Sequence, residues 1–356
     1  MIEVDGGSGE GGGQILRTAV ALASVLGIDL SVKNIRAGRS SPGLQAQHLA
    51  GVRAASEICA ATVKGAEIGS VNLEYRPSKP RGGRYSLDVG TAGSVTLVLQ
   101  TLMPILAFAG GDADLDLTGG TDVRWSPPID YLRLVALPVL SWMGYDGTLK
   151  LERRGYYPKG GGKIQFSSSP IGKLTPVNRT SPGRIIETEV LSYSTGLPGH
   201  VVERIASVAK ELISTDGFPT PKVTLETKNP EEGPSTGCGV VLYGKTDRGA
   251  LIGADGLGER GKPAEVVGAE AGKKMVEELR SGMFLDRHMG DMIVPYMALA
   301  DGVSEVSVSQ LTGHTLTNIS VAESLAGVHF DIRGNLGGPG ILRVKGCGSV
   351  RLAGSS

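Results

Sequence analysis

The stretch DGGSGEGGGQILR, residues 5–17, joins an expected strand to an expected helix over residues 12–27. Six of its thirteen residues are glycine, and Glu10 places a carboxylate in the middle. A glycine-rich turn between a strand and a helix is also where dinucleotide-binding folds carry the motif GxGxxG. That spacing begins here at Gly7, so this turn decides whether the chain opens such a fold.

The residues after this turn argue against a dinucleotide-binding fold. In that fold the second strand closes with an acidic residue that holds the ribose. Here it ends at residues 35–39, IRAGR, without an acid. Arg36 suits the 2′-phosphate of NADP, but no second half of the fold follows. The spacing GxxxxGK[ST] of phosphate-binding loops does not occur in this turn. It occurs at residues 239–246, GVVLYGKT, inside a segment expected to be a strand and not a loop before a helix.

The glycines of residues 5–17 nevertheless suit a phosphate. A simple tight turn is the alternative, but six glycines exceed what such a turn needs. Backbone amides that glycines leave exposed at the start of a helix favour phosphate groups. Glu10 would repel phosphates unless a cation such as Mg²⁺ bridges them. The turn therefore predicts a nucleotide site with a divalent metal.

The order of expected elements repeats along the chain as three β-α-β-α-β-β units. A repeated unit that shares one core with its neighbours is the simplest interpretation. The right-handed crossover rule places both helices of a unit on one face of its sheet. The expected helices span residues 12–27, 42–61, 93–110, 127–144, 291–300 and 314–326, and the expected strand pairs that close the units are 71–77 with 84–90, 149–157 with 162–170, and 328–334 with 340–346.

A further segment, from residue 184 to about 282, contains its own expected strands and two helices, at residues 200–214 and 263–281. It is too long for a loop, and it predicts an inserted domain. The expected division is residues 1–183 for the first two units, 184–282 for the inserted domain, and 283–356 for the third unit, which completes the main domain.

The composition limits the class of protein. The 36 basic and 36 acidic residues cancel, so no overall field attracts nucleic acid, and a polyanion needs a local cluster of arginines. Aromatic residues make up 4% of the chain, which disfavours wide stacking platforms for single strands. Three distant cysteines without CxxC disfavour a disulfide framework or a zinc site. With no signal peptide and no membrane-length apolar stretch, we expect a soluble, cytoplasmic protein.

Arginines gather in sequence around the glycine-rich turn. Arg36 and Arg39 precede the second expected helix, and Arg17 lies on the first. Guanidinium groups match phosphate oxygens in pairs, so the three predict a phosphate pocket, although ordinary surface ion pairs are the alternative. Gln47 and His48 follow on the second helix.

His314, in LTGHTLTNI (residues 311–319), is the strongest candidate for a nucleophile among the histidines. It stands where an expected strand gives way to a helix. The positive end of the helix dipole disfavours imidazolium, so a histidine there tends to be neutral and nucleophilic. His329, in an expected strand, is interpreted as structural.

Eight segments together resemble the RNA 3′-terminal phosphate cyclase family. In order they are DGGSGEGGGQILR, IRAGRSSPGLQAQHLAGV, EICAATVKGAEIGS, GTAGSVTLVLQTLMP, GGTDVRWSPPIDY, RGYYPKGGGKI, PYMALADG and HTLTNI. The resemblance extends from Ile2 to about Gly346. It implies an α+β fold of repeated units, each of two helices on a four-stranded sheet, with a smaller inserted α/β domain, similar to the enolpyruvyl transferase fold.

The resemblance also implies an activity. Members of the family use ATP and a divalent metal, Mg²⁺ or Mn²⁺, to convert an RNA 3′-phosphate into a 2′,3′-cyclic phosphate. A histidine first takes AMP from ATP, the RNA 3′-phosphate then takes AMP from the histidine, and the vicinal 2′-OH finally displaces AMP.

Matching the family's motifs assigns roles to individual residues of this chain. His314 matches the nucleophile and Glu10 a carboxylate near the metal and triphosphate, and Arg39 is expected to be needed for catalysis. The residues expected to hold phosphates of ATP or of the RNA end are Arg17, Arg36, Arg39 and Gln47; those expected to bind ATP are Gln100, Pro127, His288, Met289, Gly290, Asp291 and Met292.

Two departures from the family pattern affect this assignment. The family often has tyrosine at the position of His288. The imidazole ring of His288 can stack on adenine, but it offers less area than a tyrosine ring. QLTG precedes the nucleophile here in place of a run that contains proline or cysteine.

The sequence leaves two alternative functions to consider, as well as the possibility of a homodimer. A branch of the same fold acts in ribosomal RNA processing without catalysis, but it lacks the nucleophilic histidine. Enolpyruvyl transferases share the fold logic without HTLTNI. Exposed sheet edges on repeated units make a homodimer plausible.

Overall fold

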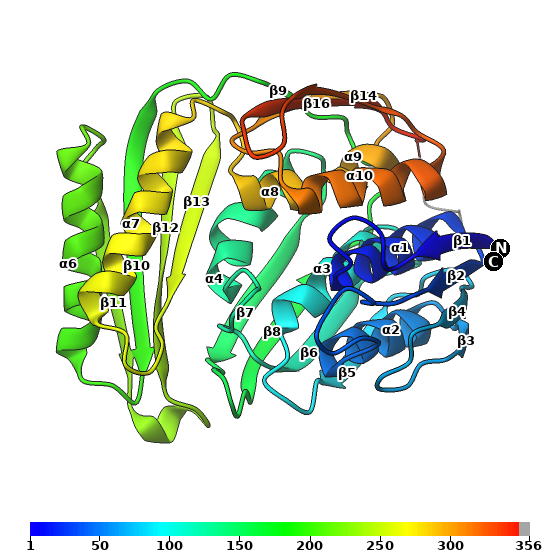
Figure 1. Ribbon diagram of the computed structural model, residues 1–356, viewed down its shortest axis with the longest axis horizontal. Helices are drawn as coiled ribbons and strands as arrows, with labels where there is room; N and C mark the ends of the chain where they lie inside the picture. Colours follow the sequence, from blue (N-terminus) through cyan, green and yellow to red (C-terminus); the bar gives the residue numbers. More distant parts are fainter. Residues whose placement is uncertain (349–356) are drawn as a thin grey trace.

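Four four-stranded sheets organise the chain in this computed structural model, which describes residues 1–348 (Figure 1). The first unit has the sheet order β1-β2-β4-β3, in which only β1 and β2 are parallel. Its elements are β1 (Ile2–Asp5), α1 (Gly13–Leu26), β2 (Leu30–Lys33), α2 (Ala46–Ile58), β3 (Thr62–Lys64) and β4 (Leu73–Arg76).

The second unit repeats this topology with the order β5-β6-β8-β7, and again only its first two strands are parallel. Its second helix is divided by a π-helical turn. The elements are β5 (Gly83–Asp88), α3 (Val95–Ala107), β6 (Ala113–Gly119), α4 (Ile129–Tyr131), the π turn (Leu132–Ala136), α5 (Leu137–Ser141), β7 (Gly147–Arg153) and β8 (Gly162–Ser168).

The third unit has the equivalent order β15-β16-β14-β9, and its first strand, β9, again pairs in parallel with the second, β14. The three copies of a unit with helices on a mixed four-stranded sheet confirm the predicted fold class. The elements are β9 (Asn178–Arg179), α8 (Arg287–Met292), α9 (Val294–Leu299), β14 (Val303–Val308), α10 (Gly313–Ala326), β15 (Phe330–Gly334) and β16 (Gly340–Lys345).

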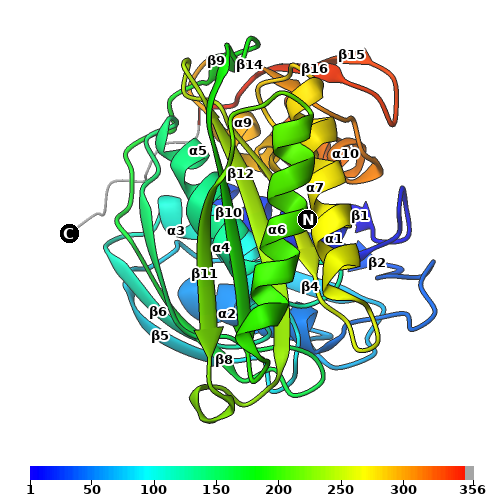
Figure 2. The ribbon, with the colours of Figure 1, turned by 90° about the vertical axis from the view of Figure 1, so that its left-hand side faces the viewer.

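Residues between β9 and α8 form the fourth sheet, with order β11-β10-β12-β13. Figure 2 shows α6 and α7 together in front of this sheet, and the two helices pack on it around Ile205, Ala209 and Met275. The elements are β10 (Ile185–Thr195), α6 (Gly199–Thr215), β11 (Lys222–Lys228), β12 (Gly237–Thr246), β13 (Leu251–Leu257) and α7 (Ala264–Arg280).

Two details of the predicted units were wrong. The sequence predicts that residues 84–90 pair with residues 71–77 in the first sheet. In the structure these residues form β5, which pairs with β6 of the second sheet, and β4 pairs instead with β3. β3 is only three residues long and mostly exposed, so it lacks the apolar alternation that marks a strand. The two-residue strand β9, which supplies the first strand of the third unit, was also missed.

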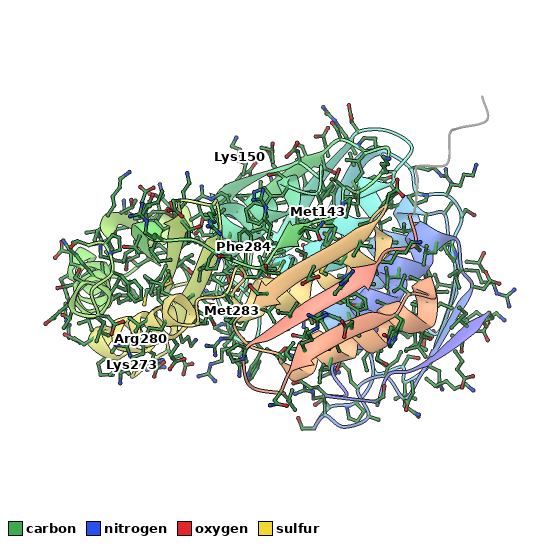
Figure 3. The ribbon with its side chains drawn as sticks, turned by 90° about the horizontal axis from the view of Figure 1, so that it is seen from above. Met143, Lys150, Lys273, Arg280, Met283 and Phe284 are labelled. Atoms are coloured by element: carbon green, nitrogen blue, oxygen red, sulfur yellow. The ribbon has the colours of Figure 1, made fainter. Side chains whose placement is uncertain are left out.

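The helices of the three units pack on one another, because α1 contacts both α3 and α10, and the buried residues of these units form one core. α1 buries Ile15, Leu16 and Val20 and ends at Gly27, which has the left-handed φ of 66° that glycine adopts without strain. Figure 3 shows the third sheet from above and labels Phe284, which packs edge-on against Trp142 with ring centroids 5.2 Å apart. Within residues 1–348, no helix has the length and apolarity to cross a bilayer.

Candidate functional site

Glu10 and His314 meet although they lie at opposite ends of the chain. Oε2 of Glu10 is 2.6 Å from Nδ1 of His314, and both side chains are partly exposed. Glycines allow this approach: a Cβ added to Gly313 would collide with the Glu10 carboxylate, and one added to Gly9 would lie 2.6 Å from Oγ1 of Thr317. The predicted nucleophile and the predicted carboxylate therefore share one site.

A polar seam between α1 and α10 fixes this arrangement. Gln14 donates to Oδ1 of Asn318 at 2.8 Å, and Thr18 donates to the same oxygen at 2.7 Å. Asn318 lies one helical turn after His314, on the same face of α10. The two helices thus begin at the same end of the seam, and their free backbone amides favour an anion there.

Asp291 holds the start of α10. Its Oδ1 accepts hydrogen bonds from Thr312 at 2.5 Å and from Thr315 at 2.6 Å, and its backbone carbonyl accepts one from Asn318 at 2.7 Å. Burial raises the pKa of Asp291, while the two threonine hydroxyls act to lower it. The carboxylate predicted to bind ATP thus orients the helix that carries His314.

The three predicted arginines gather near the start of α1. Arg39 lies over Gly12, where an added Cβ would be 2.9 Å from its Nη2, and Arg17 is half-buried beside Gln14. Arg36 donates to the carbonyl oxygens of Ser41 and Gly43 at 2.6 and 2.9 Å. Burial lowers the pKa of Arg17 to about 10.

None of these three arginines has a carboxylate within ion-pair distance in the part of the chain that the structure describes. By contrast, acidic partners lie beside many other arginines, including Arg76, Arg133, Arg154 and Arg204. Arg39 is exposed and Arg36 is half-buried, whereas Arg17 is half-buried with its Nε enclosed and without a hydrogen-bond partner. A guanidinium enclosed in this way without a counter-charge is costly unless an anion binds it. The cluster therefore favours an anionic ligand.

His48 completes the cluster as a neutral side chain. A Cβ added to Gly13 would lie 2.1 Å from its Nε2, and its Nδ1 accepts a hydrogen bond from the Gln45 amide at 3.2 Å. Burial, together with the charges of Arg17 and Arg36, lowers the pKa of His48 from 6.5 to about 3.

Acid is expected to destabilise the protein through His48. Between pH 6.5 and about 3 the unfolded chain binds this proton and the folded chain does not, so stability falls as the pH falls. From pH 7 to pH 5 this costs about 2 kcal/mol. Denaturant unfolding at both values checks it: His48→Gln should lose less stability on acidification than the wild type, and equal losses would contradict the interpretation.

The other phosphate and ATP residues lie around this centre. Oε1 of Gln47 accepts from the Ser94 amide at 3.1 Å, at the start of α3. Gln100 lines a small cavity together with Arg17, Asp291 and Met292, which brings four of the predicted residues to one place.

The remaining predicted ATP residues stand nearer to the inserted segment. The carbonyl of Pro127 accepts from Thr96 at 2.9 Å. The ring of His288 lies edge-on to Tyr131, with centroids 5.7 Å apart, and its Nε2 is 3.7 Å from Oδ1 of Asp255. Met289 is fully buried, and Gly290 allows α8 to approach Val308 closely.

The acidic and histidine side chains of the site do not by themselves form a metal cage. Within residues 1–348 no group of three or more histidine, cysteine or acidic side chains is placed to hold a metal ion. Mg²⁺ is often bound by one or two carboxylates together with substrate phosphates. Glu10, beside the arginine cluster, fits that mode and not a metal cage made of protein alone.

Comparison with known proteins identifies the family. The sequence model of RNA 3′-terminal phosphate cyclase matches residues 8–332. The chain belongs to the RNA 3′-terminal phosphate cyclase family. It is 46% identical over 349 residues to the RNA 3′-terminal phosphate cyclase of Ignicoccus hospitalis, covering 97% of this chain and 99% of that protein. For the protein of the same name from Caldivirga maquilingensis the identity is 49% over 328 residues, covering 91% and 92%.

The sequence analysis did not predict the residues that hold α1 and α10 in place around Glu10 and His314. Gln14 and Asn318 join the two helices, and Thr312 and Thr315 form a capping box at the start of α10. The motif TxxT directly around His314 was a signal for the capping box. The pairing of Gln14 with Asn318 depends on how α1 and α10 pack, and no local pattern reports it.

Proposed function

We propose that this protein converts an RNA 3′-terminal phosphate to a 2′,3′-cyclic phosphate with ATP, through a covalent histidinyl-AMP. The main support for this proposal is the contact of His314 with Glu10, near Arg17 and Arg39, which have no acidic partner within residues 1–348. A histidine at this position disfavours the alternative, a non-catalytic role in ribosomal RNA processing.

In the first step, Nε2 of His314 attacks the α-phosphorus of ATP. Oε2 of Glu10 lies 2.6 Å from Nδ1, although the two atoms are not aligned for a hydrogen bond in this structure. In the proposed step the ring turns so that Nδ1–H donates to Glu10, which leaves the Nε2 lone pair free. A P–N bond forms, the bond to the bridging oxygen breaks, and pyrophosphate leaves with that electron pair. The imidazole gains positive charge, which the Glu10 carboxylate stabilises.

Arg17, Arg39 and the helix starts then stabilise the charge that develops on the phosphates. A divalent metal, Mg²⁺ or Mn²⁺, held by Glu10 and the phosphates would supply further neutralisation when bound.

The second and third steps transfer AMP and close the ring. An oxygen of the RNA 3′-phosphate attacks the phosphorus of the AMP on His314, the P–N bond breaks, and a pyrophosphate linkage to adenosine forms. The 2′-OH then attacks the activated 3′-phosphorus, AMP leaves, and the hydroxyl proton is lost. This last step is intramolecular, so alignment of the 2′-OH supplies much of its rate.

Arg39→Ala is expected to slow AMP transfer to the protein by roughly 10- to 100-fold, because a hydrogen bond to a charged group contributes about 1.5–3 kcal/mol. The measurement is the rate of protein labelling from ATP carrying label at the α-phosphate. Arg53→Ala, at an exposed position on α2, is the matched control and should retain the wild-type rate. Equal rates in both variants would remove Arg39 from the phosphate site.

Two assays test the proposed function as a whole. The protein is mixed with metal and α-labelled ATP without RNA, denatured and mapped, and an acid-labile, alkali-stable AMP is expected on the peptide that contains His314. An oligoribonucleotide with a 3′-phosphate is then expected to become resistant to phosphatase. If neither occurs and ATP does not bind, the non-catalytic alternative replaces the proposal.

A further inference from the structure

A second cleft lies between the second unit and the inserted segment. One wall is the loop that follows β6 and carries Trp125, and the other is formed by the end of β13 and by α7, with Asp255 and Lys274. Asp122 and Tyr193 line its floor. Pro127 and His288 do not line this cleft, but Pro128 and Asp255 do, so the cleft lies next to the residues expected to hold adenosine.

Trp125 is held in the cleft wall at an energetic cost. Its φ is 62°, in the left-handed region that bulky side chains rarely adopt, and its side chain is 91% exposed. Strain of this kind costs on the order of 1–3 kcal/mol and concentrates at ligand sites. An indole presented to solvent in this way offers its face to a flat ligand.

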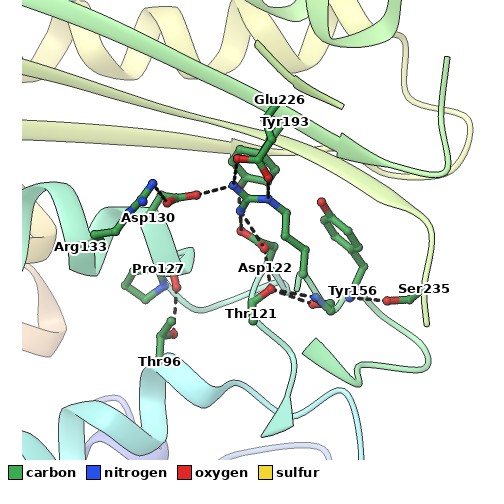
Figure 4. A network of polar contacts seen from close by, with 12 residues as sticks. Thr96, Thr121, Asp122, Pro127, Asp130, Arg133, Tyr156, Tyr193, Glu226 and Ser235 are labelled. Atoms are coloured by element: carbon green, nitrogen blue, oxygen red, sulfur yellow. Dashed lines mark hydrogen bonds and ion pairs between the residues drawn. The ribbon is translucent and has the colours of Figure 1, made fainter. Parts of the chain in front are cut away.

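Asp122 and Tyr193, which line the cleft, belong to a buried network of polar contacts (Figure 4). Tyr193 donates to Oδ1 of Asp122 at 2.7 Å, and Arg154 stacks on the Tyr193 ring with Cζ 3.5 Å from its centroid. Arg154 also bonds Asp130 at 2.6 Å. Both acids and the arginine are fully or almost fully buried, so the cleft keeps its shape without a ligand.

The charged groups in the cleft walls are already matched. Arg124 pairs with Glu259, Lys262 pairs with Glu270, and Lys274 donates to the carbonyl of Asp255 at 3.1 Å. No surplus of positive charge is left to attract phosphates. The features that remain for recognition are the indole face and polar groups able to meet the edge of a base.

The cleft connects to the proposed active site through a short chain of contacts. Asp255 is 3.7 Å from Nε2 of His288. His288 and Asp291 share α8, and Asp291 binds the threonines on either side of His314. The cleft therefore adjoins the residues expected to hold the adenosine of AMP, which the RNA 3′-phosphate must approach in the proposed second step.

We propose that the cleft binds a nucleobase of the RNA substrate near its 3′-phosphate, stacked on Trp125. This inference rests on the proposed function, since it takes RNA as the substrate. Binding there depends on stacking and therefore changes little with salt.

Fluorescence can isolate this residue, because the chain has only two tryptophans. Trp142→Phe leaves Trp125 as the single tryptophan, and the substitution keeps a ring against Phe284. We expect an oligoribonucleotide with a 3′-phosphate, added without ATP, to quench the emission of this variant. The quench should persist between about 50 and about 200 mM salt. No quench, or its loss at the higher salt concentration, would overturn the proposal.

Kinetics provide the second test. Trp125→Ala is expected to weaken binding of the same oligonucleotide about tenfold, in line with the loss of one base–aromatic stack, and Trp125→Phe should restore most of it. Labelling of the protein by ATP without RNA should stay unchanged in both variants. Unchanged RNA affinity would overturn the proposal, and so would a loss of labelling, which would place Trp125 in the ATP site. RNA binding is measured without ATP, so failure of the proposed chemistry would be seen separately, as absent labelling of the wild type.

Discussion

His314→Ala is expected to abolish AMP transfer to the protein and the cyclisation that depends on it. In the proposed mechanism the P–N bond forms on Nε2 of His314, so labelling from α-labelled ATP should fall to background. The fold should remain intact, because His314 is partly exposed and, within residues 1–348, its side chain makes one close polar contact, with Glu10. Thr312 and Thr315 continue to cap α10 in the variant.

His329→Ala is the matched control for this experiment. His329 lies just beyond the other end of α10, and its Nδ1 is 3.0 Å from Oε1 of Glu323, so it also contacts a glutamate. Its side chain is 88% exposed, and it should be dispensable for labelling. A label that persists in His314→Ala at the wild-type level would show that another residue is the nucleophile.

The sequence predicted the repeated architecture because long helices with buried faces carry a strong periodic signal. α1 and α3 lie within the expected ranges, and both bury most of their length. β9 has two residues, and it is defined by its pairing with β14 rather than by its own side chains. A strand of that kind depends on tertiary contacts, so sequence alone does not reveal that the third unit begins before the inserted segment.

The candidate site shows the same division. Glu10 and His314 were found through local motifs, and the fold brings them to 2.6 Å. The role of Asp291 was harder to predict, because its two threonine partners lie more than twenty residues away in sequence. The buried ion cluster around Arg154 was missed completely, since Asp122, Asp130 and Glu226 come from a loop, from α4 and from β11.

Arg154→Met is expected to destabilise the protein by about 3–5 kcal/mol, the usual cost of removing one partner from a buried ion pair. Burial acts to lower the pKa of Arg154, but Asp122, Asp130, Tyr193 and Glu226 raise it well above its ordinary value. Without the guanidinium, Asp122 remains buried with hydrogen bonds only from Thr121 and Tyr193. Asp130 keeps Arg133 as a partner, so most of the cost falls on Asp122.

Arg153→Met is the control for Arg154→Met, because the neighbouring arginine is exposed and donates one hydrogen bond to the carbonyl of Gly161 at 2.8 Å. Denaturant unfolding should show less than about 1 kcal/mol of change in that variant. Equal stability of the two variants would mean that the ion cluster makes no net contribution to the free energy of unfolding.

The cluster also joins the inserted segment to the second unit. Glu226 and Tyr193 belong to β11 and β10, whereas Asp122 and Asp130 belong to the second unit. Loss of Arg154 should therefore also loosen the inserted segment, and faster hydrogen exchange of β10 amides in Arg154→Met would separate this effect from a uniform loss of stability.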